Sequence, residues 1–317
     1  MGKYMFENYK NIGASHRQNR ELLKAVHSYS KAYSIMKKIG EIDIEFLLDM
    51  ALLLDEFGMK NEAIEKYSEV IDHDSGEERA YYGLAIIYDE LEEYHRAIDY
   101  YKKAIEINSE YDRAYFFLAN VYDVIGEKEK AIEMYKRVIG LIDDDFWALV
   151  NLGCIYEELN ENFMAKEYME RAIAIDSKHY MALYNMGVIM KKIGETKKAK
   201  DFYIESLEAN KHYDYTFLNL AVIYKEENNF IEAIRVISEG IIYNGESEFL
   251  YYNRACFYAI IGEYSKAIED IKEALELYPE FIKYITLDNE LMKLKELKEF
   301  KKIIEKHREK IDNKDTL

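Results

Sequence analysis

Four asparagines recur at a constant interval in the C-terminal half of the chain and could bind a peptide backbone. Asparagine offers both a hydrogen-bond donor and an acceptor, so it can pair with a peptide group whatever side chain the peptide carries. The row consists of Asn151, Asn185, Asn219 and Asn253, each 34 residues from the next. We call this position of the 34-residue interval the asparagine column. Earlier in the chain the same position is occupied by Asp49, Gly83 and Phe117. We therefore predict a backbone clamp in the C-terminal half, with Asn120 as a further candidate. The alternative is that asparagine is only a soluble residue on an exposed face.

Aromatic and charged side chains in neighbouring columns could hold the apolar and charged groups of the same ligand. The aromatic candidates directly precede the asparagine column and are Tyr82, Phe116, Tyr184 and Tyr252. Another column changes sign along the chain, from Asp55, Asp89, Asp123 and Glu157 to Lys191 and Lys225. We hypothesise a bipolar ligand whose basic part meets the acids and whose acidic part meets the lysines, because complementary charges set direction and speed association. The alternatives are rings that only pack between units and charge rows that are inert.

No motif in the sequence assembles a catalytic or metal-binding constellation. The seven histidines stand at unrelated positions, and the sequence lacks a paired-histidine metal motif, a glycine-rich phosphate loop and a nucleophile elbow. The adjacent carboxylates at 143–145 fall in a predicted turn, where helix capping explains them. We predict no enzymatic activity, no cofactor and no metal. A hidden metal or carboxylate site is the remaining enzymatic alternative.

A strict 34-residue period indicates which elements position these side chains. One column holds alanine seven times, at Ala63, Ala97, Ala131, Ala165, Ala199, Ala233 and Ala267. Within each period the apolar residues recur at three- and four-residue steps, which predicts two helices. Between the two helices the chain has Gly or Asn, residues that tolerate a left-handed turn, with Glu92 as the exception. A repeat of this length predicts a solenoid whose units bury their apolar faces against one another.

These columns resemble the tetratricopeptide repeat family over residues 44–281. The family's pattern of large and small residues is matched in the fourth unit by Leu149, Leu152, Gly153, Tyr156, Ala165, Met169 and Ala172. The resemblance implies an all-α, right-handed superhelical solenoid of helix-turn-helix repeats, whose first helices line a concave groove. The asparagine row is similar to the ladder in the repeat domain of the glycosyltransferase that adds N-acetylglucosamine to Ser and Thr. The ligand so implied is an extended peptide.

The repeat register divides the chain into an array and two ends. We predict an N-terminal helical cap at 1–43, whose segment Asn19–Ile39 has helical spacing, and a divergent C-terminal helical cap at 282–317. Solenoids need such caps to cover the apolar faces of their terminal units. The seven predicted units span residues 44–77, 78–111, 112–145, 146–179, 180–213, 214–247 and 248–281.

Charge and composition limit the partners. The chain has a net charge of −18, and the array alone, with 25 basic and 49 acidic residues, carries −24. Such an excess of acid argues against a nucleic-acid backbone as partner, although much of it serves only solubility. The two cysteines, Cys154 and Cys256, are predicted to be reduced because three repeat lengths separate them. No apolar run is long enough to span a bilayer and the first residues are too polar for a secretory signal, so we expect a cytoplasmic protein without a membrane partner.

The sequence predicts a binding function without identifying the ligand. The leading interpretation is a non-enzymatic interaction scaffold or adaptor that holds an extended peptide, or a partner's segment, in the concave groove. The alternative is a peptide-sensing regulatory receptor that acts by sequestering a partner protein. We expect protein or peptide partners and leave self-association open.

Overall fold

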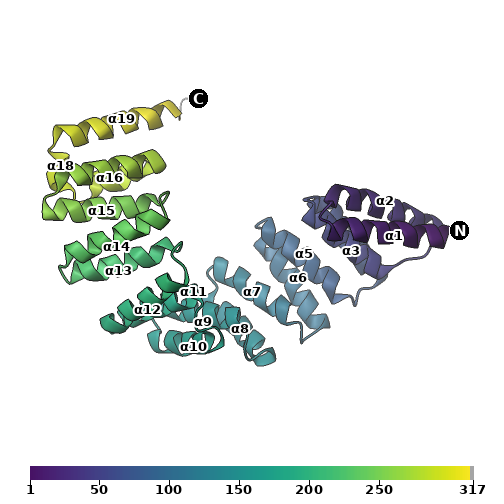
Figure 1. The fold of residues 1–317 in the computed structure, drawn as a ribbon. Coiled ribbons are helices and arrows are strands. Elements are labelled where there is room, and N and C mark those ends of the chain that lie inside the picture. The colour runs from purple at the N-terminus through teal and green to yellow at the C-terminus, as the bar shows by residue number, and fades with distance from the viewer. Residues whose placement is uncertain (315–317) are drawn as a thin grey trace. The chain divides into compact units, whose positions relative to one another are not determined.

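The computed structural model describes residues 1–314, and every regular element in this range is a helix. The all-α fold class predicted from the sequence is therefore confirmed. The chain forms two compact units, unit 1 (Met1–Ile155) and unit 2 (Tyr156–Leu317), and α9 (Phe146–Glu158) crosses the boundary. In each unit, consecutive helices pair as antiparallel hairpins that follow one another along the chain (Figure 1).

Unit 1 begins with a long hairpin and continues with regular pairs whose first helices start 34 residues apart, at 44, 78, 112 and 146. The first helices that start at 44, 78 and 112 each contact their own second helix. The helices that precede α9 are α1 (Gly2–Gln18), α2 (Leu22–Ile39), α3 (Ile44–Glu56), α4 (Lys60–His73), α5 (Glu78–Glu90), α6 (Tyr94–Ile107), α7 (Asp112–Val124) and α8 (Lys128–Leu141).

Unit 2 keeps the same interval through three further pairs and ends in shorter elements. No helix in the described part of the chain combines the length and apolar character that crossing a membrane requires. The regular helices are α10 (Asn162–Ile175), α11 (Tyr180–Lys192), α12 (Thr196–Ala209), α13 (Asp214–Glu226), α14 (Phe230–Tyr243), α15 (Glu248–Ile261) and α16 (Tyr264–Leu277). The closing elements are η1 (Pro279–Phe281), α17 (Ile282–Leu287), α18 (Met292–Lys295) and α19 (Lys298–Lys314).

The turn between the two helices of each pair has one residue in the left-handed conformation. Glycine occupies it four times, and Asn160 and Asn228 adopt it with φ of 60° and 58°. Glu92 takes the same conformation with φ of 59°, although it lacks both the freedom of glycine and the short side chain of asparagine. The turn geometry is therefore set by the repeat and not by the residue type alone.

Small residues in one helix make room for large ones in its partner. Ala97, Ala131 and Ala199 are fully buried, and so are the tyrosines one turn later in the same helices, Tyr101, Tyr135 and Tyr203. A Cβ atom added at Gly187 would lie 2.5 Å from the ring of Tyr203, so only glycine lets α11 and α12 approach as they do. This alternation builds the core.

The N-terminal segment, predicted as a helical cap, contains α1 in addition to the helix expected over Asn19–Ile39. Its Gly13 lies against the ring of Tyr29 in α2, because an added Cβ would be 2.2 Å from that ring. Phe6 and Tyr29 each meet Phe46 of α3 edge to face, with ring centroids 5.2 Å apart. The hairpin therefore covers α3 with the same glycine-and-tyrosine packing as the array, outside its 34-residue register.

The C-terminal segment covers the last regular pair. Helix α19 contacts α16 and α17 and buries Phe300, Ile304 and His307. Nδ1 of His307 lies 2.9 Å from the Ile303 carbonyl oxygen, whereas its buried Nε2 lies 3.4 Å from a Glu276 carboxylate oxygen and makes no hydrogen bond. The proposed cap at 282–317 extends to 315–317, which lie outside the described residues.

Candidate functional site

The asparagines of unit 2 lie on the first helices α11, α13 and α15 and are half-buried. The side-chain nitrogen of Asn219 donates to the hydroxyl of Tyr184 at 2.8 Å. That of Asn253 donates to the Phe249 carbonyl, one turn earlier in the same helix, also at 2.8 Å. Asn185 is engaged in contacts of its own. One donor of each of Asn219 and Asn253 is thus already used within the protein.

In unit 1, a tyrosine hydroxyl joins two candidate asparagines. The hydroxyl of Tyr135 donates to Oδ1 of Asn120 and accepts from Nδ2 of Asn151, the latter at 2.9 Å. The two amides are themselves 3.4 Å apart, from Asn151 Nδ2 to Asn120 Oδ1. Phe116 packs against the same tyrosine, with ring centroids 5.7 Å apart. Three of the predicted site residues therefore form one cluster around Tyr135.

Two tyrosines of the second helices contact members of the asparagine column in different ways. Tyr67 and Tyr135 each stand 16 residues before a member of the asparagine column, Gly83 and Asn151. The Asn151 amide reaches the hydroxyl of Tyr135, whereas an added Cβ at Gly83 would lie 2.2 Å from the ring of Tyr67. The contact between Tyr135 and Asn151 was not predicted from the sequence.

Aromatic side chains surround the amides of unit 2. The Tyr184 ring lies 5.0 Å from that of Tyr213, edge to face, and burial raises the pKa of the Tyr184 hydroxyl to about 12. Further along, Tyr215 stacks on Phe249 with centroids 5.2 Å apart and remains 51% exposed. This strip offers both ring faces and hydroxyl groups. In unit 1, Tyr82 is instead enclosed by other rings, with Tyr111 at 5.1 Å.

Tyr252 belongs to a different cluster from the asparagines. Its hydroxyl donates to a carboxylate oxygen of Asp288, which the thiol of Cys256 also approaches at 3.5 Å. Among the described residues, Cys256, Asp288 and Glu290 could offer ligand atoms to a metal ion, since these atoms lie within 4.8 Å of one another. The ammonium group of Lys225 pairs with Glu290 at 2.5 Å, and burial raises the pKa of the Cys256 thiol. Internal bonds therefore satisfy the cluster as it stands.

The candidate lysines all have acidic partners. Lys191 pairs with Glu226, Lys225 with Glu290, and the neighbouring Lys192 with Glu157 at 2.5 Å. These pairs lie near the surface, where such contacts contribute about 0–1 kcal/mol. An acidic ligand would have to displace these carboxylates.

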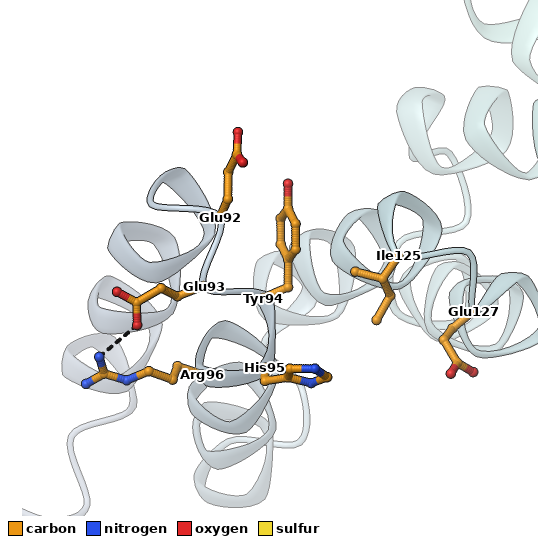
Figure 2. Close-up of a pocket in the computed structure, with 7 residues that line it drawn as sticks. All are labelled: Glu92, Glu93, Tyr94, His95, Arg96, Ile125 and Glu127. Atoms are coloured by element: carbon orange, nitrogen blue, oxygen red, sulfur yellow. Dashed lines mark hydrogen bonds and ion pairs between the residues drawn. The ribbon is translucent and has the colours of Figure 1, made fainter.

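A hollow of about 540 Å³ lies at the turn between α5 and α6 and the corresponding turn after α7. Figure 2 shows its side chains spread apart, with Glu93 turned towards Arg96, to which it is bonded at 2.8 Å, and Glu127 on the far side. Arg96 also lies over the ring of Tyr88, 3.7 Å from its centroid. The polar groups do not converge on one point, so the hollow has the character of an open charged surface.

A smaller cavity of about 300 Å³ opens beside α3 and α5 and was not predicted from the sequence. We call it the α3–α5 pocket. Its apolar lining comes from Leu48, Leu52 and Ile86, and its acidic lining includes Asp49 and Asp55. The pocket lies where Gly83 replaces the asparagine found in later repeats.

The tetratricopeptide repeat family matches residues 78–111, 112–145, 148–179, 182–213 and 249–281, which is more than half of the chain. The chain therefore belongs to the tetratricopeptide repeat family. Such tandem repeats are protein–protein interaction scaffolds that bind protein partners, and families of this kind are generally non-catalytic. Residues 19–77 also match the family of anaphase-promoting complex subunit 5. No curated protein matches the sequence.

Solved structures share the fold. A chain of the APC/C hetero-tetramer Cut9–Hcn1 is similar over 90% of this chain at 16% identity, with a TM-score of 0.54. The similarity covers 52% of that chain, so the present chain spans about half its length. MamA protein is 30% identical over 56% of this chain and 94% of its own, with a TM-score of 0.49. YrrB, a TPR protein with an unusual peptide-binding site, is 21% identical over 62% of this chain and 98% of its own, with a TM-score of 0.46.

Proposed function

We propose that the chain is an interaction scaffold that holds an extended segment of a partner protein along the first helices of unit 2. The observation that carries this proposal is the row of half-buried amides on α11, α13 and α15, beside the exposed ring of Tyr215. An amide row at the repeat interval can bond to successive parts of an extended backbone, and exposed rings give apolar anchors.

The internal bonds of the asparagines orient their amides. Because Nδ2 of Asn219 donates one hydrogen to Tyr184, the second hydrogen and Oδ1 are directed away from that hydroxyl. Fixing the amide before binding reduces the entropy lost when the ligand arrives. Tyr184 therefore acts as a positioning residue for Asn219, and the lysines Lys191 and Lys225 lie outside the amide row as parts of surface ion pairs.

The proposal is tested with short peptides selected from a displayed library against the full chain. Replacing Asn185 and Asn219 together by alanine removes two amides, each worth about 0.5–1.5 kcal/mol in a net hydrogen bond. The affinity of the selected peptides, measured by fluorescence polarisation, should fall by roughly tenfold or more. The thermal midpoint should change little, because both side chains are only half-buried.

The matched control is Tyr184→Phe, which keeps the ring and removes the hydroxyl that Asn219 contacts. It should weaken the peptides much less than the double alanine variant, since the amide itself remains. Unaltered affinity in the double variant would reject the amide row as the binding device. The receptor alternative predicts in addition that a bound peptide changes the dimensions of the chain in X-ray scattering.

A further inference from the structure

The α3–α5 pocket of unit 1 combines apolar side chains with two aspartates. Leu52 is 43% exposed there, although it is flanked by the buried residues Ala51 and Leu53. The cavity volume of about 300 Å³ is close to the lower end of small ligand sites and suits one large side chain. An exposed leucine in the lining of a cavity favours a ligand with a hydrocarbon portion.

The two aspartates of the pocket accept no hydrogen bond within the described residues. Asp49 is exposed and forms no ion pair in that part of the chain, although the charges of Arg17 and Lys10 act on it. Oδ1 of Asp55 is buried without a hydrogen-bond partner and forms one long ion pair, with the ammonium group of Lys60 at 3.8 Å. Burial raises the pKa of both carboxyl groups above the ordinary value. A cation that entered the pocket would relieve this desolvation.

The arginines that also line the pocket do not supply that cation. The Arg79 guanidinium is held by Glu45 and Glu77, with nitrogen–oxygen distances between 2.6 and 3.0 Å. Its hydrogen bonds keep the pKa of the Glu45 carboxyl below the usual value. Arg113 is exposed and exerts its charge on the tyrosines Tyr82 and Tyr111. Asp49 and Asp55 are therefore left as the acceptors for an incoming cation.

The absence of a side chain at position 83 makes room for the Tyr67 ring, which lines the pocket together with Gly83. An added Cβ at Gly83 would be 2.2 Å from the end of the buried Tyr67 ring. In unit 2 the corresponding positions carry Asn185 and Asn219.

We propose that the α3–α5 pocket binds the side chain of an arginine or lysine in a partner's peptide. The aliphatic stem packs on Leu48, Leu52 and Ile86, and the charged head lies between Asp49 and Asp55. Long basic side chains bury their stems on apolar surface while the head contacts polar groups. The negative charge of the array favours the approach of such a peptide. This inference rests on the proposed function in that the ligand is a peptide, but it involves none of the asparagines of unit 2.

The test uses the full chain and a capped amino acid, Nα-acetyl-arginine methylamide, with the lysine derivative in parallel. Methyl-labelled protein reports the resonances of Leu48, Leu52 and Ile86 during the titration. We expect saturable shifts at these methyl groups with an affinity in the millimolar range. The neutral citrulline derivative has nearly the same shape and should produce shifts at least tenfold weaker.

The variant Asp49→Asn with Asp55→Asn removes both acids and should abolish saturation by the arginine derivative. Its matched control is Glu62→Gln with Glu65→Gln, which makes the same charge change at exposed positions of α4 and should bind like the wild type. Equal binding of citrulline, absence of saturable shifts in the wild type, or full binding by the aspartate variant would each overturn the proposal. The citrulline comparison needs no variant, so a folding defect leaves it valid. Failure here leaves the amide row of unit 2 untouched, and a failed amide row leaves this titration unaffected.

Discussion

Unit 1 and unit 2 pack their helices alike but expose different side chains on their first helices. In both, a buried alanine stands one turn before a large side chain, as with Ala97 and Tyr101 or Ala199 and Tyr203. Unit 1 has aspartates around a cavity, whereas unit 2 has oriented amides and paired lysines. The packing columns are fixed by volume, so binding chemistry is free to vary only in the columns that face outward.

The largest expected effect concerns a place where an ion pair interrupts the apolar columns of unit 2. Arg254 and Asp270 form a two-bond ion pair, at 2.7 and 2.8 Å, in the α15–α16 hairpin. Their columns hold Leu220 and Val236 one repeat earlier, both buried. Replacing Arg254 by leucine leaves the Asp270 carboxylate buried without its partner. We expect the free energy of unfolding, measured by chemical denaturation, to fall by about 3–5 kcal/mol.

The double variant Arg254→Leu with Asp270→Val restores the ordinary column and is the control. It should be about as stable as the wild type or more stable, because well-packed apolar residues often replace a buried ion pair without loss. A double variant as unstable as the single one would show that Arg254 acts through packing or through its bond to Ser238 at 3.0 Å.

The pH dependence of the single variant follows from the same burial. Burial raises the pKa of Asp270 even with Arg254 present, so removal of the arginine raises it further. A carboxyl group whose folded pKa exceeds its unfolded pKa binds its proton more tightly in the folded state, and stability is lost as pH rises through the folded pKa. The deficit of Arg254→Leu should therefore be smaller at about pH 4 than at about pH 7. An equal deficit at both values would contradict a buried charge as its cause.

The sequence predicts the repeats well because their signals are local. Glycine and asparagine mark the turns at Gly58, Gly126 and Asn228, and the alanine column marks where helices touch. Helix α1 escaped prediction because its glycine-and-tyrosine pair, Gly13 and Tyr29, lies outside the 34-residue register. The packing of that hairpin resembles the packing of the repeats, but its place in the chain does not follow their register.

The candidate sites were less predictable because they depend on contacts between repeats. The asparagine row was visible in the sequence, but the bonds of Asn151 to Tyr135 and of Asn219 to Tyr184 join different helices. In the α3–α5 pocket, the Tyr67 ring fills the space over Gly83. This contact joins two helices, so it cannot be predicted from one column of the repeat. Pairing of Lys191 with Glu226 likewise needed the two repeats side by side.

An intermediate effect is expected where the two units use one tyrosine column differently. The hydroxyl of Tyr135 bonds to Asn120 and Asn151, whereas that of Tyr203 makes no hydrogen bond within the described residues. Tyr135→Phe should lower the free energy of unfolding by about 1 kcal/mol, the net value of a typical hydrogen bond. Tyr203→Phe is the matched control, since its ring is equally buried, and should be nearly neutral in the same denaturation experiment. Equal losses would mean that the hydrogen bonds of the Tyr135 hydroxyl do not contribute to the free energy of unfolding.

The smallest expected effect compares the turns of the two units. Glu92 in unit 1 and Asn228 in unit 2 occupy equivalent positions with φ of 59° and 58°. The left-handed conformation costs an ordinary residue about 1 kcal/mol, and asparagine lowers that cost through its short polar side chain. Glu92→Asn should therefore stabilise the protein by roughly 0.5–1 kcal/mol in thermal or chemical denaturation, and the reverse exchange, Asn228→Glu, should destabilise it by a similar amount. If both exchanges are neutral, the repeat packing alone sets the turn, and the two units do not differ in strain at this position.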